Sequence, residues 1–325
     1  MSRTAEVSLI MTVLNEESGI VEFLDSIASQ SVIPAEIVIV DGGSRDGTVN
    51  ALRSWARPVG CSLVVEVLAG AGISQGRNRA IELASHARVL VADGGTTLDG
   101  RWVEHMLAAF PDDGSTAVVG GFFRPTGDSV VERAIAFAVT PMLDEIEPEH
   151  FLPSSRSLGF SRDAWSRAGG YPEWLDYCED LVFDLRMKKL GVPFRFAPEA
   201  IVTWAARPSV RGFMKQYYRY ARGDGKASLW AKRHAARYGA YVGGAGLFAF
   251  GFVTPWSWLV MVLGFAAYQR KFFRRVWRRR AEIPMPIRTL ALVPVVVVSG
   301  DIAKMAGYPA GLIWRAKHGR TRADY

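Results

Sequence analysis

Short apolar runs alternate with amphipathic stretches over the first 121 residues. The apolar runs are rich in β-branched side chains and occupy residues 7–14, 36–41, 63–69, 87–93 and 116–121. Between them, residues 20–28, 47–56, 72–84 and 101–110 carry apolar side chains at helical spacing. Strands separated by helices are typical of βαβ units. The pattern therefore predicts an α/β fold with a mostly parallel central sheet flanked by helices.

Two of the predicted strands end on an aspartate. Asp41 closes EIVIVD and Asp93 closes VLVAD. Ligands in open α/β sheets bind beyond the carboxyl ends of the strands, so both carboxylates are expected at a ligand-binding edge. Residues 121–206 are less regular, and there we expect acceptor-binding loops and the start of a catalytic helix in CEDLVFDLRMKKLG.

The C-terminal part contains a long uncharged run. Residues 238–269 include no Asp, Glu, Lys or Arg, with Thr254-Pro255 near the middle. About 20 apolar residues suffice for one spanning helix, so the run predicts either one long tilted span or two short helices meeting at the proline. The helical hairpin is favoured, because a single crossing would place the basic segment 270–280 opposite the basic residues before Tyr238. A buried soluble core is the remaining alternative.

Two further segments follow the predicted hairpin. Residues 270–280 hold seven cations in eleven positions and place Phe272, Phe273, Val276 and Trp277 on one helical face, as in an interfacial amphipathic helix. Residues 287–316 are apolar apart from a few charges, and we expect them in the membrane interface or packed on the hairpin.

Charge is distributed unevenly along the chain. Residues 1–206 carry 17 Lys and Arg against 28 Asp and Glu, whereas residues 207–280 carry 16 against one. A basic second part favours contact with a polyanion or membrane surface. Because the cations flank apolar runs, lipid headgroups are the expected partner and nucleic acid is not. The two cysteines, Cys61 and Cys178, predict no disulfide framework, and the N-terminus predicts a first strand rather than a signal peptide.

Four short motifs carry candidate chemistry, and each also has a structural explanation. They are TVLNEE with DGGSRDGT (12–17 and 41–48), GISQGRNRAIELA (72–84), YCEDLVFDLRM (177–187) and QYYRYARGDGKA (216–227). A carboxylate beside a glycine turn accepts hydrogen bonds from a nucleoside, and turns also favour Asp and Gly. Arg77 and Asn78, expected in the first turn of a helix, suit a phosphate. Glu179 and Asp180 suit a general base, although acids at helix starts are common.

Taken in order, these motifs resemble the family 2 glycosyltransferases with the GT-A fold over roughly residues 6–230. TVLNEE, VDGGSRDGT, GRNRAIELA, VADGG, CEDLVFDLRM and QYYRY match six ordered landmarks of that family. The resemblance implies transfer of a sugar from a nucleotide-sugar donor, a UDP- or GDP-sugar, to an acceptor hydroxyl with inversion at the anomeric carbon. It also implies a Rossmann-like catalytic domain, residues 1–230. The uncharged run and its basic flanks predict a membrane-associated helical region over residues 231–325.

The resemblance assigns a role to each candidate residue. Asp180 is the expected general base, and Glu179 orients the acceptor. The donor-binding residues are expected to be Thr12, Glu16, Asp41, Arg77, Asn78 and Asp93, and the acceptor- or phosphate-binding residues Arg156, Gln216, Arg219 and Arg222.

Two departures from the family pattern concern a metal ion. Gly95 stands where the second Asp of Asp-x-Asp usually binds the metal, and Trp204 stands where a histidine is common. Mg²⁺ or Mn²⁺ held by Asp93, water and the donor diphosphate is the favoured expectation. The alternative is that Arg77, Arg156, Arg207 and Arg219 balance the leaving group.

The variant VADGG motif and the C-terminal helices look closest to exopolysaccharide glycosyltransferases of the succinoglycan type. That similarity implies a lipid-linked or glycan acceptor at the cytoplasmic face of the cytoplasmic membrane, with a homo-oligomer as one option. Two alternatives remain open: a polyprenyl-phosphate glycosyltransferase, and a catalytically silent nucleotide-sugar-binding membrane subunit.

Overall fold

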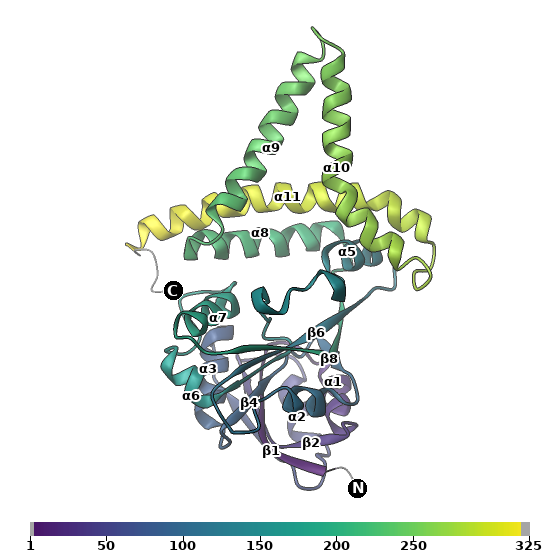
Figure 1. Cartoon of the computed structure of the whole chain (residues 1–325). Helices are drawn as coiled ribbons and strands as arrows, with labels where there is room; N and C mark the ends of the chain where they lie inside the picture. Colours follow the sequence, from purple (N-terminus) through teal and green to yellow (C-terminus); the bar gives the residue numbers. More distant parts are fainter. Residues whose placement is uncertain (1–2, 320–325) are drawn as a thin grey trace. The chain divides into compact units, whose positions relative to one another are not determined.

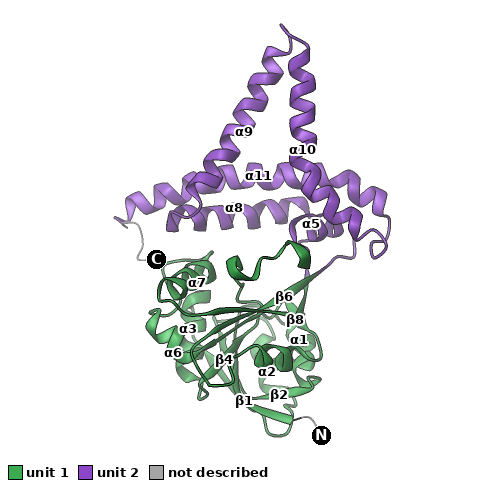
Figure 2. Ribbon diagram, in the orientation of Figure 1, with its two compact units in different colours: residues 1–124, 143–204, 324–325 green, residues 125–142, 205–323 purple. Residues whose placement is uncertain are grey.

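The computed structural model describes residues 3–319 (Figure 1). These residues form two compact units (Figure 2). Within the described range, the first unit comprises residues 3–124 and 143–204, and the second comprises residues 125–142 and 205–319. The boundary expected at residue 230, between the catalytic domain and the membrane-associated region, stays a prediction. Residues 1–2 of the first predicted domain and 320–325 of the second lie outside the described residues.

The first unit is built on a mixed eight-stranded sheet in the order β3-β2-β1-β4-β7-β6-β8-β5. Its strands are β1 (Arg3–Val13), β2 (Val32–Asp41), β3 (Ser62–Val67), β4 (Arg88–Val91), β5 (Thr96–Leu98), β6 (Val118–Thr126), β7 (Leu158–Ser161) and β8 (Phe194–Ala205). Strands β3, β2, β1 and β4 pair in parallel, whereas the β4·β7, β6·β7 and β5·β8 pairs are antiparallel. The predicted α/β fold is confirmed, with parallel pairing confined to one half of the sheet.

Helices cover both faces of this sheet. They are α1 (Ile20–Ala28), α2 (Thr48–Ser54), α3 (Ile73–Leu83), α4 (Trp102–Ala108), α6 (Arg162–Arg167) and α7 (Glu179–Lys189), with two 3-10 turns, η1 (Leu143–Glu145) and η2 (Pro148–His150). Side chains alternate between faces along a strand. Leu9 and Met11 of β1 therefore join the core that includes α1, α2 and α4, and Ile10 joins the core that includes α3, α6 and α7.

The second unit is helical. It contains α5 (Val130–Val139), α8 (Val210–Ala227), α9 (Ala231–Phe250), α10 (Trp256–Arg278) and α11 (Pro286–Lys317). The uncharged run 238–269 forms parts of two helices, α9 and α10, which are joined by a turn that contains Thr254-Pro255 and diverge from that tip (Figure 1). Phe252, Val253 and Trp256 at the tip are 73%, 77% and 73% exposed, so the end of the hairpin presents apolar side chains outward.

Helix α11 passes the length and composition test for a membrane span, and within residues 3–319 no other helix does. It nevertheless lies side by side with α8 (Figure 1). Glycines allow this close approach: a Cβ at Gly307 would collide with the Tyr218 carbonyl oxygen, and one at Gly311 with the Arg222 carbonyl oxygen. Helix α11 is thus a packing partner of α8, which limits how much of its surface is available to lipid.

A methyl group added at Gly311 is expected to lower the free energy of unfolding. Because the Arg222 backbone cannot rotate away, Gly311→Ala should cost about 1–3 kcal/mol through overpacking. Gly244→Ala is the matched control, since a Cβ there meets nothing within 4 Å and replacing a helical glycine gains up to about 1 kcal/mol. Thermal unfolding of both variants in detergent measures the difference; equal midpoints would contradict the close packing.

Candidate active site

The Arg77 guanidinium joins two carboxylates that are far apart in the sequence. Its Nη1 donates to Glu179 Oε1 and its Nη2 donates to Asp93 Oδ1, both at 2.7 Å. The side chain is 2% exposed and lies over the Tyr171 ring, with Cζ 5.4 Å from the centroid. Burial alone would lower the pKa of Arg77, but the charges of Asp93 and Glu179 raise it. The guanidinium is therefore a permanent cation between the end of β4 and the start of α7.

Helix α3 places Arg77 and Asn78 further from its start than expected. It begins at Ile73, so Arg77 and Asn78 lie in its second turn, and the prediction that they stand in the first turn among free N–H groups is wrong. The Asn78 amide is used within the protein: Nδ2 donates to the Tyr171 carbonyl oxygen and to Glu173 Oε1, and Oδ1 accepts from the Tyr171 N–H. Asn78 thereby anchors the loop that leads to α7, and direct donor binding by Asn78 stays a prediction.

The adjacent acids open α7, as the sequence predicts. Glu179 is its first residue, and Cys178 before it adopts a left-handed conformation with φ 66°. Such a conformation is strained for a residue with a side chain and is common at functional sites. Burial and the Asp180 charge raise the pKa of Glu179 from its ordinary 4.5 to about 7, although the Arg77 charge opposes them. Glu179 is therefore protonated more readily than an exposed glutamate.

Asp180 has one well-bonded and one weakly bonded carboxylate oxygen. Oδ1 accepts from the Leu181 N–H at 2.8 Å, whereas Oδ2 accepts from the Ser155 N–H at 3.4 Å. The residue is half-buried. Ser155 is itself held by Tyr171, with its hydroxyl 3.0 Å from the tyrosine hydroxyl. The weakly bonded oxygen leaves Asp180 able to accept a proton from a bound hydroxyl.

Asp41 closes β2 and holds the glycine loop that follows it. Its Oδ1 accepts from the N–H groups of Gly43 and Ser44 at 2.8 and 2.7 Å, and its Oδ2 accepts from the Ser44 hydroxyl at 2.5 Å. Gly43 has φ +97°, a conformation that favours glycine. The carboxylate is fully buried, so its contacts in this structure are within the loop, and nucleoside binding by Asp41 stays a prediction.

Thr12 and Glu16 lie next to that loop. The methyl group of Thr12 faces Gly76 of α3, where a Cβ would come within 2.6 Å of it. The Glu16 N–H donates to the Thr48 hydroxyl at 2.8 Å, and its side chain is half-buried. Thr12 therefore fixes the approach of α3 to β1, while contact of either residue with a donor stays a prediction.

Asp93 faces a second arginine. Arg156 Nε lies 3.9 Å from Asp93 Oδ2, and its guanidinium carbon lies 5.5 Å from the centre of the Trp204 ring. Trp204, which stands where the family often has histidine, is thus placed to support this cation. Thr96 pairs with Trp204 across β5 and β8, and its hydroxyl donates to the Asp93 carbonyl oxygen.

The surroundings of Asp93 limit how a divalent ion could be held. No cluster of three or more His, Cys, Asp or Glu side chains suitable for a metal occurs in residues 3–319. One Asp93 oxygen is hydrogen-bonded to Arg77, and the side chain is 29% exposed. The other oxygen, Oδ2, lies 3.9 Å from Arg156 Nε. A divalent ion at Asp93 would therefore share Oδ2 with Arg156 and keep several water ligands, as Mg²⁺ often does.

Three candidate residues lie in the second unit. Gln216 is buried in α8 and donates to the Tyr220 hydroxyl at 2.8 Å. Arg219 and Arg222 follow on the same helix. Their participation in substrate binding stays a prediction.

Sequence reasoning missed Ser155, Tyr171 and Asp184. Ser155 and Tyr171 gave no signal because neither lies in a motif. Asp184 is one helical turn beyond Asp180, fully buried, and neither of its oxygens has a hydrogen-bond partner. Burial raises its pKa well above the ordinary value, and the Asp180 charge adds to this. The spacing of four residues from Asp180 was the available signal.

The sequence of this chain is similar to those of known glycosyltransferases. The model of the family described as "Glycosyl transferase family 2" matches residues 8–159, and that of "Glycosyl transferase family group 2" matches residues 151–299. The glycosyltransferase AglE of Haloferax volcanii is 26% identical over 228 residues, which cover 69% of this chain and 74% of that protein. The succinoglycan biosynthesis protein ExoA of Rhizobium meliloti is 25% identical over 234 residues, 68% of this chain and 69% of that protein.

The fold of this chain is similar to that of a solved glycosyltransferase structure. The mannosyltransferase PcManGT of Pyrobaculum calidifontis, in complex with GDP-Man and Mn²⁺, superposes with a TM-score of 0.54 at 19% identity, covering 92% of this chain and 87% of that one. The fold is therefore GT-A, a glycosyltransferase fold. The chain belongs to the family 2 glycosyltransferases, enzymes of glycan biosynthesis.

Proposed function

We propose that this protein is an inverting glycosyltransferase that transfers a sugar from a UDP- or GDP-sugar to the hydroxyl of a lipid-linked or glycan acceptor at the cytoplasmic face of the membrane. The observation that carries this proposal is the joining of Asp93, at the end of β4, to Glu179 through Arg77. Glu179 is the first residue of α7, and Asp180 follows it. One ligand-binding edge thus holds a carboxylate suited to the donor and a carboxylate suited to the acceptor.

Direct displacement with inversion requires a base for the acceptor proton and a cation for the leaving group. Asp180 takes the proton through its weakly bonded oxygen as the acceptor hydroxyl attacks the anomeric carbon. Glu179, held by Arg77, orients the acceptor. Arg156, next to Asp93 and Trp204, stabilises the charge that grows on the departing nucleoside diphosphate.

A divalent ion is part of this proposal. The PcManGT complex contains Mn²⁺, and Asp93 would hold Mg²⁺ or Mn²⁺ in this protein. When bound, the ion would neutralise charge on the donor diphosphate.

Asp93→Ala is expected to cut sugar transfer severely, by about 10²-fold or more, because it removes the carboxylate proposed to hold the ion. EDTA should lower wild-type transfer comparably, and added Mn²⁺ should restore it. Nucleotide release assays with and without EDTA measure both effects. Asp112→Asn, an exposed carboxylate distant in sequence from every motif, is the control. Transfer that is near normal in Asp93→Ala would refute the role of Asp93.

Insertion of the hairpin into one leaflet is the proposed mode of membrane attachment. The uncharged parts of α9 and α10, residues 238–250 and 256–269, extend about 20 Å each at 1.5 Å per residue. The hydrocarbon core is about 30 Å thick, so neither leg crosses it. Both basic flanks then stay on one side, in agreement with the preference of cations for the cytoplasmic face.

A donor screen tests the proposed function. Purified protein is incubated with UDP- and GDP-sugars, a membrane-lipid extract, and Mg²⁺, Mn²⁺ or EDTA, while nucleotide release is followed. Bare polyprenyl phosphate and a polyprenyl-diphosphate sugar, supplied separately, distinguish a lipid phosphate acceptor from a sugar hydroxyl. Donor binding without turnover on any acceptor would favour the catalytically silent subunit and overturn the proposal.

A further inference from the structure

Four of the seven cations in the basic segment 270–280 form two contrasting pairs. Arg275 Nη1 donates to the Ala138 carbonyl oxygen at 3.0 Å, and Arg279 Nη2 donates to the Pro141 carbonyl oxygen at 3.3 Å. Both arginines are buried and satisfy carbonyl groups at and just beyond the end of α5, where the helix dipole favours a positive charge. These two cations have a structural function.

Arg270 and Arg274 lack such partners. Both are exposed, and no hydrogen bond or ion pair joins either one to another residue within 3–319. They stand four residues apart on α10, so their side chains are neighbours on one helix face and repel each other. The sequence contains no acid between Asp224 and Glu282 that could neutralise them. The pair is therefore available to bind an anion from outside the chain.

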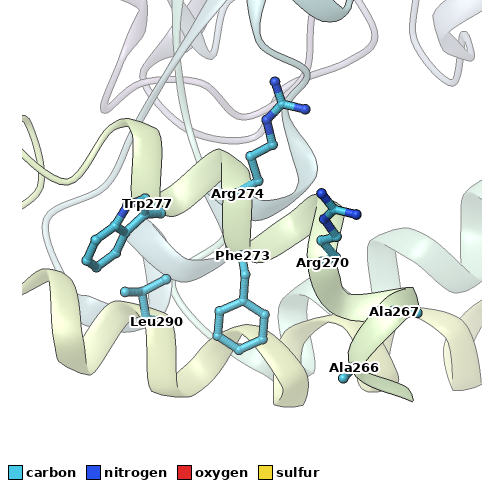
Figure 3. A pocket seen from close by; sticks show the side chains of 7 residues that line it. All are labelled: Ala266, Ala267, Arg270, Phe273, Arg274, Trp277 and Leu290. Carbon is cyan, nitrogen blue, oxygen red and sulfur yellow. The ribbon is translucent and has the colours of Figure 1, made fainter. Parts of the chain in front are cut away.

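An apolar groove lies beside these two arginines. It has a volume of about 760 Å³ between α10 and α11 and is lined by Ala266, Phe273, Trp277 and Leu290 together with Arg270 and Arg274. The two guanidinium groups extend away from Phe273 and Leu290 (Figure 3). Trp277 is 55% exposed. A ligand that fits this groove has an anionic end and a hydrocarbon end.

We propose that the α10–α11 groove binds one anionic glycerophospholipid of the bilayer. Its phosphate would lie against Arg270 and Arg274, and the upper part of an acyl chain would lie along Phe273, Leu290 and Ala266. Arginine suits phosphate because of its planar set of donors, and exposed tryptophan is typical of the membrane interface. This inference rests on the membrane attachment in the proposed function, and it adds a defined lipid site at the base of the inserted hairpin.

Native mass spectrometry of the full-length protein in detergent tests the site with phosphatidylglycerol as the probe. Wild-type protein is expected to retain one phosphatidylglycerol, and Arg270→Gln/Arg274→Gln to bind it at least tenfold more weakly. Arg53→Gln/Arg57→Gln is the matched control, because those arginines have the same spacing and the same charge change in the first unit. Ala266→Phe, which fills the groove without changing charge, should also weaken retention. Equal retention in wild type and in Arg270→Gln/Arg274→Gln would overturn the inference.

Competitors identify the occupant. Inorganic phosphate at millimolar concentration should fail to displace phosphatidylglycerol, because it lacks the hydrocarbon end. Displacement by polyprenyl phosphate at lower concentration than phosphatidylglycerol would overturn the assignment to a bilayer phospholipid. Flotation with phosphatidylcholine vesicles tests membrane attachment separately. If the wild-type protein fails to float with the vesicles, hairpin insertion is refuted. If Arg270→Gln/Arg274→Gln floats normally and retains phosphatidylglycerol like wild type, only the lipid site in the groove is refuted.

Discussion

Asp180→Asn is expected to lower kcat for sugar transfer by about 10²–10⁴-fold, the usual contribution of general base catalysis. Asparagine keeps the shape of the side chain, and its Oδ1 can still accept from the Leu181 N–H. Its NH2 group, in place of the weakly bonded oxygen, can accept neither the Ser155 N–H nor the acceptor proton. Donor affinity should stay within a few-fold of wild type, because the lost function concerns the acceptor. Steady-state kinetics and calorimetric titration of the nucleotide measure the two quantities.

The control for this variant is Asp112→Asn, which makes the same chemical change at an exposed position and should leave kcat unchanged. A second comparison is Asp184→Asn, which removes the buried acid one turn further along α7. If Asp180→Asn retained near-normal turnover while Asp184→Asn lost it, the base would have been assigned to the wrong residue of this helix.

Arg77→Leu is expected to lower the free energy of unfolding by about 3–5 kcal/mol, the usual cost of removing one partner from a buried ion pair. The substitution leaves the carboxylates of Asp93 and Glu179 without their shared cation, and Glu179 has 9% of its side chain exposed. Arg77→Leu/Glu179→Gln should be less destabilised than the sum of its single variants, because the second change removes the uncompensated charge. Chemical denaturation measures all four proteins.

The same site predicts a dependence of stability on pH. Burial, together with the Asp180 charge, raises the pKa of Glu179 to about 7 from its ordinary 4.5, so the folded protein binds this proton more tightly than the unfolded chain. The free energy of unfolding should therefore fall as pH rises from about 4.5 to 7, with no further loss from this group above that range. Arg77 opposes this shift, so the deficit of Arg77→Leu should be larger at pH 8 than at pH 5. An equal deficit at both values would contradict the assigned interaction.

The sequence predicted much of the fold because its signals were local. The alternation of apolar runs and amphipathic stretches, and the uncharged run 238–269, depend on periodicity and composition. The position of Arg77 within α3 was misjudged, because helix ends are the least certain feature of a sequence pattern. The antiparallel half of the sheet was also not apparent, since β7, at Leu158–Ser161, has only four residues.

The motifs predicted candidate site residues one by one, but they did not predict the contacts among them. Sequence spacing did not indicate that Asn78 holds the loop at Tyr171, or that the Asp41 carboxylate holds Gly43 and Ser44. Both residue types have the hydrogen-bonding capacity for either task. Only the position of the neighbouring backbone decides which groups they contact.

The sequence by itself determined the α/β class, the acids at the strand and helix ends, and the concentration of cations after residue 206, because each follows from residue type and local order. The tertiary structure decided that Arg77 neutralises Asp93 and Glu179 together, and that Arg275 and Arg279 bond to α5 whereas Arg270 and Arg274 remain exposed. These outcomes depend on contacts between residues 16 to 138 positions apart. Such contacts are set by the packing of whole elements, which no local pattern specifies.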